Sequence, residues 1–387
     1  LVYNPTDWLS FMTRTGLDYN NQDIESRNNP TDLAGLRGSY SHSLSKEAVT
    51  NFDFLATAKK SNVFIERLSG SLSAGATRWN RELYGINGKS GSQFKDPWIF
   101  SFSNYDLSKQ SNVIQSSQIP GEERLQKRIN SVYGFLDLSY ADFLFLQVTG
   151  RNDWSSTLPA KNNSYFYPSS SLSFVFSEFT KNIEWLNFGK LRLAYAGAAT
   201  DADPYQLLPT FSSSSFAGFP AHSIKDELPP IELRPQRSES KEIGIELKLF
   251  ESRLKLDFTY YNTLSTNQIM SAPLAVSSGF NSVKFNSGKM RNKGIEIIAS
   301  YDVIRHRDLN WTIGFNGAMN QNKLISLDGV NKVIEVGSFF GSAGPILQVE
   351  VGEKYGNIYG WDYLYNDKGH KVVVTRKDAT GKVIGTL

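Results

Sequence analysis

The feature that most constrains the fold of this chain is a strict alternation of apolar and polar residues, which recurs in long segments. In RLKLDFTYY (253–261), the even-numbered residues from Leu254 to Tyr260 are apolar or aromatic, and polar residues separate them. KEIGIELKLF (241–250) alternates in the same way from Ile243 to Leu249. Because successive side chains of an extended strand point to opposite faces, this pattern predicts β-strands with one apolar and one polar face.

The lengths of these segments favour strands that cross a membrane. We count about eleven of them, many of roughly 9 to 13 residues, whereas strands in globular proteins average about 5 to 6. At about 3.3 Å per residue and a tilt near ~40°, such strands span the roughly 25 Å apolar band of an outer-membrane barrel. The sequence therefore predicts an all-β fold, an antiparallel up-and-down transmembrane β-barrel.

The connections between these segments alternate in length. The short ones are expected at 59–62, 139–142, 250–253 and 304–308, with a longer one at 177–187; the long ones are expected at 78–126, 197–236 and 265–290, with a moderate one at 152–164. Short turns at one end and long loops at the other are typical of outer-membrane barrels, whose long loops are extracellular. A soluble all-β protein with long loops is the alternative.

Composition excludes several other classes. No apolar run is longer than about four residues, far short of the roughly 20 that a membrane-spanning helix needs. A net charge of +3 without a basic stripe argues against nucleic-acid binding. The chain has no cysteine, so it has neither disulfides nor thiolate chemistry. Its 13% of aromatic residues favours strands over helices.

Catalytic, metal-binding and cofactor-binding motifs are lacking in the sequence. It contains no Gly-x-Ser-x-Gly, HExxH or P-loop, and its four histidines are scattered. Asp201 and Asp203 in TDADPY lack the glycine and glutamate of an EF-hand, so an Asx turn is the preferred interpretation. Nothing singles out a pair of carboxylates for glycoside hydrolysis. We therefore predict no enzyme activity, no cofactor and no metal site.

The polar face of the alternating segments carries the candidate substrate-path residues. They are Lys190, Arg192, Glu242, Glu246, Lys248, Lys255 and Asp257. In a barrel these side chains line the lumen, since charge on the lipid face is costly; in a half-buried soluble sheet they face bulk water. Their nearly balanced charge suits a neutral, hydrogen-bonding solute.

The hairpin at 150–178 is expected to form part of the barrel rim. Arg151 to Asp153 are interpreted as residues that favour a turn. Trp154, Tyr165 and Tyr167 are expected to flank the apolar band at headgroup level. A ligand-contacting aromatic loop is the functional alternative, in which Trp154 belongs to the substrate path.

This hairpin, GRNDWSSTLPAKNNSYFYPSSSLSFVFSE, closely resembles the barrel signature of SusC/RagA-type TonB-dependent outer-membrane transporters. Further resemblance lies, in order, in TDWLSFMTRTGLDY (6–19), NFDFLATAKK (51–60), INSVYGFLDLSY (129–140), the segment 233–269, NSGKMRNKGIEI (286–297) and VGEKYGNIYGWDY (351–363). One departure is LRLAYAGAATDADPY (191–205), where the family commonly shows Tyr-Gly-x-Thr-Gly-Asn. The geometry of that loop, and any contact it makes, is therefore open.

The resemblance implies a 22-stranded barrel in the cell outer membrane, filled by an N-terminal plug. It also implies a TonB box that contacts the energy-transducing complex, and a SusD-like surface lipoprotein that covers the mouth as a lid. We expect residues 1–387 to be a partial barrel domain with about half of the strands, the plug and the remaining strands lying outside it.

Two functions remain open. One is TonB-driven uptake of a bulky nutrient, an oligosaccharide or an oligopeptide; the other is a passive porin or an adhesin barrel that displays loops. Four aromatic residues of the predicted long loop 78–126 are further path candidates: Trp79, Tyr84, Trp98 and Tyr105. They can stack on sugar rings or peptide side chains, or pack against the lid lipoprotein.

Overall fold

The structure is a computed structural model. It describes residues 1–28, 39–63, 65–89, 99–101, 121–216, 219–224, 226–230, 232–327, 333–338, 344–372, 375–377 and 383–386. The chain divides into two compact units, Leu1–Gln321 and Asn322–Leu387. The first unit carries nearly all of the main sheet.

The main sheet is built from long strands that follow one another along the chain. They are β1 (Val2–Thr6), β2 (Leu9–Asn28), β3 (Ser39–Lys60), β4 (Leu68–Lys89), β5 (Gly121–Tyr140), β6 (Leu144–Ser155), β7 (Ser164–Val175), β8 (Leu186–Thr200), β12 (Gln236–Leu249), β13 (Leu254–Pro273), β14 (Ser282–Arg305) and β15 (Asn310–Ser326). Except for β1, these strands are between 12 and 24 residues long. The long elements therefore match the expected eleven.

The order of strands in the sheet is that of an up-and-down meander. From β1 to β8 each strand pairs with its successor, β8 pairs with β12, and the order continues through β13 and β14 to β15. The strand–strand registers described along this path are antiparallel, as each hairpin closes locally. Only the two-residue β11 (Glu227–Leu228) is parallel, where it meets the start of β14. The predicted all-β antiparallel fold is confirmed.

Helical structure is minor in the described residues. A 3₁₀ turn, η3 (Phe176–Phe179), lies between β7 and β8, and another, η4 (Val276–Ser278), between β13 and β14. No helix in the described ranges has the length and apolarity required for crossing a membrane.

Strand registers place the apolar residues on one face. Across β12 and β13, Ile243 pairs with Tyr260, Ile245 with Phe258 and Leu247 with Leu256. Paired residues of an antiparallel sheet share a face, so these side chains form one apolar surface. It continues through Leu191 and Leu193 of β8, Leu172 and Phe174 of β7, and Ile295 and Ile297 of β14. The predicted assignment of faces is confirmed for these strands.

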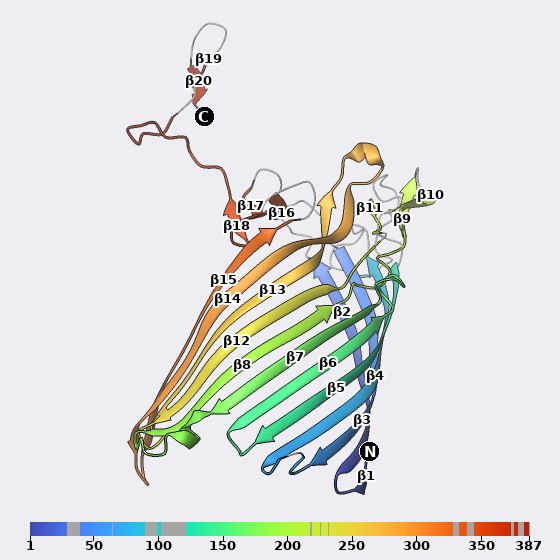
Figure 1. The fold of residues 1–387 in the computed structure, drawn as a ribbon. Helices are drawn as coiled ribbons and strands as arrows, with labels where there is room; N and C mark the ends of the chain where they lie inside the picture. Colours follow the sequence, from blue (N-terminus) through green and yellow to red (C-terminus); the bar gives the residue numbers. More distant parts are fainter. Residues whose placement is uncertain are drawn as a thin grey trace. The chain divides into compact units, whose positions relative to one another are not determined.

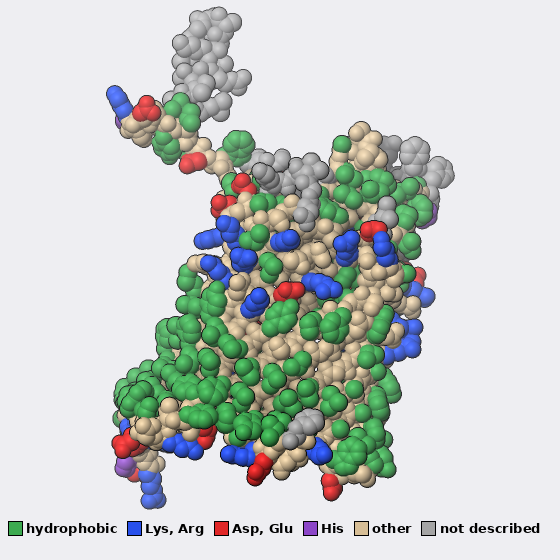
Figure 2. Space-filling model, in the orientation of Figure 1, with side chains coloured by type: hydrophobic (Ala, Val, Ile, Leu, Met, Phe, Trp, Pro, Cys, Tyr) green, Lys and Arg blue, Asp and Glu red, His purple; other side chains and the backbone are tan. Residues whose placement is uncertain are grey.

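The apolar face is the outer face of a curved sheet. Figure 1 shows β2 to β4 curving back behind the strands at the front. Figure 2 shows the same convex side, with hydrophobic side chains spread over the sheet. We call this side the outer face and the concave side the inner face.

The two ends of the sheet differ in the length of their connections, as expected, but the predicted bounds of several loops are wrong. The turn at 250–253 lies where predicted, between β12 and β13. Within the predicted long loop 78–126, residues 78–89 belong to β4 and residues 121–126 to β5; most of 265–290 is strand, because β13 extends to Pro273 and β14 begins at Ser282. The connection 201–235 is long, and it contains β9 (Phe211–Phe216), β10 (Phe219–Ile224) and β11. Strands continue beyond the apolar band, where both faces are polar and alternation vanishes.

The second unit contains two small sheets. Strands β16 (Val333–Ser338), β17 (Ile346–Glu350) and β18 (Asn357–Tyr359) form an antiparallel sheet, and β19 (Thr375–Lys377) pairs with β20 (Val383–Thr386).

Candidate functional site on the inner face

The first group of polar residues on the inner face consists of four charged side chains, which we call the charged rung: Lys190 and Arg192 of β8, Glu246 of β12 and Asp257 of β13. Lys190 Nζ lies 2.6 Å from Glu246 Oε2. Arg192 Nη2 donates to Asp257 Oδ1 at 2.6 Å, and Arg192 Nη1 lies 3.6 Å from Glu246 Oε2. Two cations and two anions thus neutralise one another across three strands. Each side chain is about a quarter to a third exposed, so solvent still reaches the rung.

The other predicted charged residues lie on the same face. Lys255 Nζ is 3.8 Å from Asp302 Oδ2, and Glu242 accepts a hydrogen bond of 3.0 Å from Ser240 Oγ. The Lys248 ammonium lies 5.1 Å from the centre of the Phe188 ring, a cation–π contact. With Asp302 included, the four cations of the predicted set face four carboxylates. The inner wall from β8 to β14 therefore carries cations and carboxylates in nearly equal number.

The predicted aromatic residues are not gathered at one site. Trp79 and Tyr84 lie within β4 rather than in a loop. Trp79 pairs with Asn51 and Ile129 on the inner face. Tyr84 lies on the outer face, where the Arg124 guanidinium is 5.3 Å from its ring centre. Trp98 and Tyr105 lie outside the described residues.

Trp154 lies on the outer face of β6. It is 39% exposed and pairs with Asn130 and Ser164. An outward ring is required by the rim interpretation, whereas its level in the membrane stays a prediction. It points away from the inner face, so the structure gives no support to Trp154 as part of a substrate path.

Sequence reasoning missed a second polar group on the inner face, which we call the arginine–aspartate network: Arg14, Asp53, Ser131, Tyr133, Arg151, Asp153 and Tyr167. Asp53 accepts hydrogen bonds from Arg14 Nη2 at 3.0 Å and from Tyr133 OH at 2.6 Å. Asp153 accepts from Arg151 Nε at 2.7 Å and from Tyr167 OH at 2.8 Å. Arg151 Nη2 also donates to Ser131 Oγ at 2.8 Å.

Both carboxylates of this network are nearly inaccessible, with Asp53 5% and Asp153 6% exposed. A buried carboxylate requires hydrogen-bonded partners, and each of these has two. The interpretation of Arg151 to Asp153 as turn residues is wrong, since they lie inside β6 (Leu144–Ser155). Tyr167 and Tyr165 are likewise on the inner face and do not flank the apolar band. The repeated period of two around Gly150 was the signal that could have revealed both facts.

A third group holds the long connection 201–235 against the inner face. Lys127 Nζ of β5 lies 2.5 Å from Asp201 Oδ1; the Asp201 side chain is buried and that of Lys127 is mostly buried. Asp201 also accepts hydrogen bonds from Ser155 Oγ and Thr157 Oγ1. Asp201 is therefore the acceptor of a buried ion pair. This replaces the Asx turn that was expected there.

An apolar cluster supports this anchor. Leu158, Tyr165, Ala202 and Leu233 pack together, and Leu233 is fully buried. Near its rim, Lys161 Nζ lies 3.0 Å from Glu232 Oε1, and Asn162 Nδ2 donates to the Leu233 carbonyl oxygen at 3.1 Å. The hydrogen bond from Lys161 lowers the pKa of Glu232. The segments 156–163 and 232–234 are thus fixed to each other at the long-loop end of the sheet.

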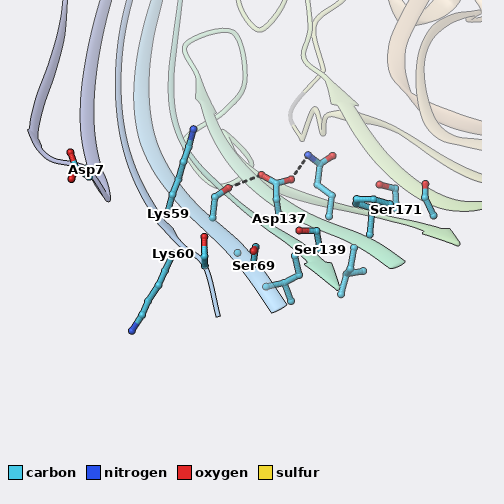
Figure 3. A pocket seen from close by; sticks show the side chains of 15 residues that line it. Asp7, Lys59, Lys60, Ser69, Asp137, Ser139 and Ser171 are labelled. Atoms are coloured by element: carbon cyan, nitrogen blue, oxygen red, sulfur yellow. Dashed lines mark hydrogen bonds between the residues drawn. The ribbon is translucent and has the colours of Figure 1, made fainter. Parts of the chain in front are cut away.

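At the opposite end, the inner face is hollowed into a polar pocket of about 660 Å³. Figure 3 shows Asp137 near its centre, with Ser139 of the same strand, β5, and Ser171 of β7. Asp137 accepts hydrogen bonds from Ser71 Oγ at 3.1 Å and from Gln147 Nε2 at 2.6 Å. The pocket offers hydroxyl, amide and carboxylate groups, which are suited to hydrogen bonding with a polar surface.

The chemistry of the inner face is that of a hydrogen-bonding wall. Within the described ranges, no group of three or more potential metal ligands occurs. Its charged groups are paired with partners up to 80 residues away in sequence, as between Asp53 and Tyr133.

The comparisons with known proteins agree with this architecture. The family model described as "TonB dependent receptor-like, beta-barrel" matches residues 2–364. TonB-dependent receptor P3 of Formosa agariphila is 30% identical over 244 residues, covering 60% of this chain and 24% of that protein. TonB-dependent receptor P39 of the same organism is 24% identical over 375 residues, covering 92% of this chain and 33% of that protein.

Solved structures show the same fold. The RagAB peptide transporter matches with a TM-score of 0.76 at 19% identity, over 95% of this chain and 40% of that chain. FpvA of P. aeruginosa bound to pyoverdine matches with a TM-score of 0.53 at 11% identity, over 84% of this chain and 39% of that chain. The chain spans a third or less of the length of the two curated relatives.

The alternating strands, the apolar convex face, the polar concave face and the family match lead to one assignment. The chain belongs to the TonB-dependent receptor-like β-barrel family, and its sheet is part of the wall of an outer-membrane β-barrel.

Proposed function

We propose that the protein imports a bulky, polar nutrient across the outer membrane in a TonB-dependent manner. The observation that carries this proposal is the inner face itself, where paired charges and hydroxyl groups line the concave side of a barrel wall. Because the charged rung is internally neutral, the wall repels neither an uncharged nor a weakly charged solute. An oligosaccharide or an oligopeptide, both rich in hydrogen-bonding groups, fits this surface. The proposed role is transport rather than catalysis.

The proposal extends to the energy source and the partners, and family membership supports it. The proposed transporter receives energy from TonB through an N-terminal region, and a SusD-like surface lipoprotein closes its extracellular mouth. The polar pocket around Asp137 lies at the short-turn end of the inner face, where a plug domain within the barrel would contact the wall. The similarity to RagAB, a peptide transporter by its description, supports an oligopeptide as the substrate class.

The test is growth of a deletion strain on oligomeric nutrients. Loss of the transporter should abolish growth on one class of oligosaccharide or oligopeptide and leave growth on the corresponding monomer intact. Re-expression of the wild-type protein should restore growth. Uptake of the labelled oligomer should stop when the proton gradient is collapsed.

A passive porin or an adhesin barrel predicts other results. If uptake persists after the gradient is collapsed, the pore is passive. If the deletion strain loses only attachment to a surface and keeps growth on every oligomer, the barrel is an adhesin.

A further inference from the structure

The outer face carries a cluster of basic residues above the apolar surface. The cluster, here called the basic patch, consists of Arg237 and Lys241 of β12 and Lys289, Arg291 and Lys293 of β14. All five side chains are exposed. Figure 2 shows Lys and Arg side chains gathered on this face, towards the end from which the long connections leave.

Strand register fixes the basic patch to the outer face. Lys241 lies two residues before Ile243 on β12, and Lys293 lies two residues before Ile295 on β14, so each shares the face of an apolar residue. Asn262 of β13 lies between them, paired with Lys241 on one side and Lys293 on the other. Residues opposite one another on neighbouring strands are about 5 Å apart. The five cations therefore occupy three successive rungs of β12 to β14.

The basic patch has little local neutralisation. Glu239 of β12 is the carboxylate on these rungs, since the other positions hold Tyr195, Gly197, Ala199, Asn262, Leu264 and Thr266. In the described part of the chain, none of the five cations forms an ion pair with a carboxylate. This contrasts with the inner face, where Lys190 and Arg192 are both paired. Five cations against one carboxylate create a locally positive surface.

A hollow lies directly below the basic patch. It has a volume of about 510 Å³, and its outer-face lining is apolar for most of its length: Leu146, Leu172, Leu193, Ile243 and Tyr260. Lys241 and Asn262 close it at the end nearest the patch. An apolar hollow with a cationic end is complementary to an anionic lipid, whose acyl chains would lie in the hollow and whose headgroup would lie at the patch.

We propose that the basic patch and the hollow bind a phosphorylated lipid of the outer leaflet. The long connections leave the sheet at the extracellular end, so the patch lies at the depth of the outer-leaflet headgroups. Basic clusters next to an apolar membrane span attract anionic headgroups, and arginine pairs well with phosphate oxygens. Charge complementarity favours phosphate over a second copy of this chain, whose own patch would repel it.

The experiment uses the purified full-length transporter in dodecyl maltoside micelles, titrated with bis-phosphorylated lipid A and followed by native mass spectrometry. The variant Lys241→Gln/Arg291→Gln/Lys293→Gln should bind roughly a hundredfold more weakly, since three phosphate-directed cations are lost. The wild-type affinity should fall as salt rises, and that of the variant less so. Inorganic phosphate at the same concentration should not compete, because it lacks the acyl chains.

The matched control removes the same charge at the other end of the sheet. Lys60→Gln/Arg67→Gln/Arg307→Gln changes three exposed cations at the short turns, and it should bind lipid A as the wild type does. Each variant is first checked for the heat-modifiable mobility of an assembled barrel. If the triple variant does not assemble, the single variants Lys241→Gln and Lys293→Gln replace it, each with a several-fold loss.

Three results would overturn the proposal. Equal binding by wild type and triple variant would show that the patch does not contact the lipid. Equal binding of lipid A stripped of its phosphates would reduce the site to an apolar hollow. A lipid-independent dimer that dissociates in the triple variant would identify the face as a contact between two copies.

Discussion

At the scale of single residues, the buried carboxylates of the inner face are the groups that contribute most to holding the strands together. Asp153 is surrounded by donors from its own strand and from β7, and Asp53 joins β2, β3 and β5 in the same way. A hydrogen bond to a charged group stabilises a protein more than a neutral one does, and a donor left without its acceptor is costly. These carboxylates therefore hold neighbouring strands in register.

We expect Asp153→Ala to lower the free energy of unfolding by about 1–3 kcal/mol, because Arg151 and Tyr167 lose their shared acceptor. The measurement is the temperature at which the assembled full-length barrel loses its compact mobility in detergent electrophoresis. The control is Asn152→Ala, the next residue on the strand, whose side chain lies on the outer face and bonds to Ser164. Equal shifts for both variants would show that the network does not stabilise the barrel.

At the scale of elements, each strand separates lipid from lumen through its alternation. Leu256 and Asp257 are neighbours on β13, yet Leu256 pairs with Leu247 on the outer face and Asp257 pairs with Glu246 on the inner face. Adjacent positions should therefore respond very differently to substitution.

Leu256→Arg should impair assembly of the full-length barrel, since a charge on the lipid face costs about 2–4 kcal/mol near the midplane. Asp257→Ala should be tolerated, because Glu246 is still 3.6 Å from the guanidinium of Arg192. Quantification of both variants in isolated outer membranes provides the measurement. Comparable losses for the two would mean that the assignment of faces is wrong.

The connection 201–235 is fixed at its first residues by Asp201 and near its end by the apolar cluster around Leu233. Asp201→Ala should release its first residues, because Lys127, Ser155 and Thr157 all donate to that carboxylate. We expect faster cleavage within this connection when protease is added to intact cells, with the amount of barrel unchanged.

Asp203→Ala is the matched control, since Asp203 is exposed and contacts only Gln206, at 3.3 Å, among the described residues. Cleavage at the wild-type rate in the Asp201 variant would show that the apolar cluster alone holds the connection.

At the scale of the whole molecule, the two faces of the sheet use charge in opposite ways. Inner-face cations are matched by carboxylates, whereas the basic patch of the outer face is not. In the proposed transporter, this wall presents a neutral path to solute and a positive surface to the membrane headgroups. The proposal therefore makes selectivity for solute charge depend on the pairs of the charged rung.

Glu246→Gln combined with Asp257→Asn should shift uptake towards anionic oligomers, since the inner wall then gains two unmatched cations. Uptake of neutral and carboxylated forms of the same labelled oligomer measures the shift. Glu82→Gln with Glu122→Gln removes the same charge from the outer face of β4 and β5 and should leave the ratio unchanged. A ratio that stays constant in both variants would remove the charged rung from the solute path.

The sequence by itself determined where most strands lie, which of their residues share a face, and that successive strands run up and down. Period-two alternation is a local property, so Ile243, Leu256 and Phe258 could be placed on one face, and Lys190, Arg192 and Asp257 on the other, without knowledge of neighbouring strands. The short turn at 250–253 was equally readable, because two alternating segments flank it directly.

Only the tertiary structure decided which polar groups meet. Arg192 and Asp257 are 65 residues apart, and their contact depends on the register of β8, β12 and β13, which no single segment encodes. The burial of Asp201 likewise arises from packing between distant segments. Strand ends were misjudged because alternation fades once a strand leaves the apolar band, while backbone hydrogen bonding continues. Local periodicity thus specifies the faces of a barrel wall, and long-range register specifies the chemistry on them.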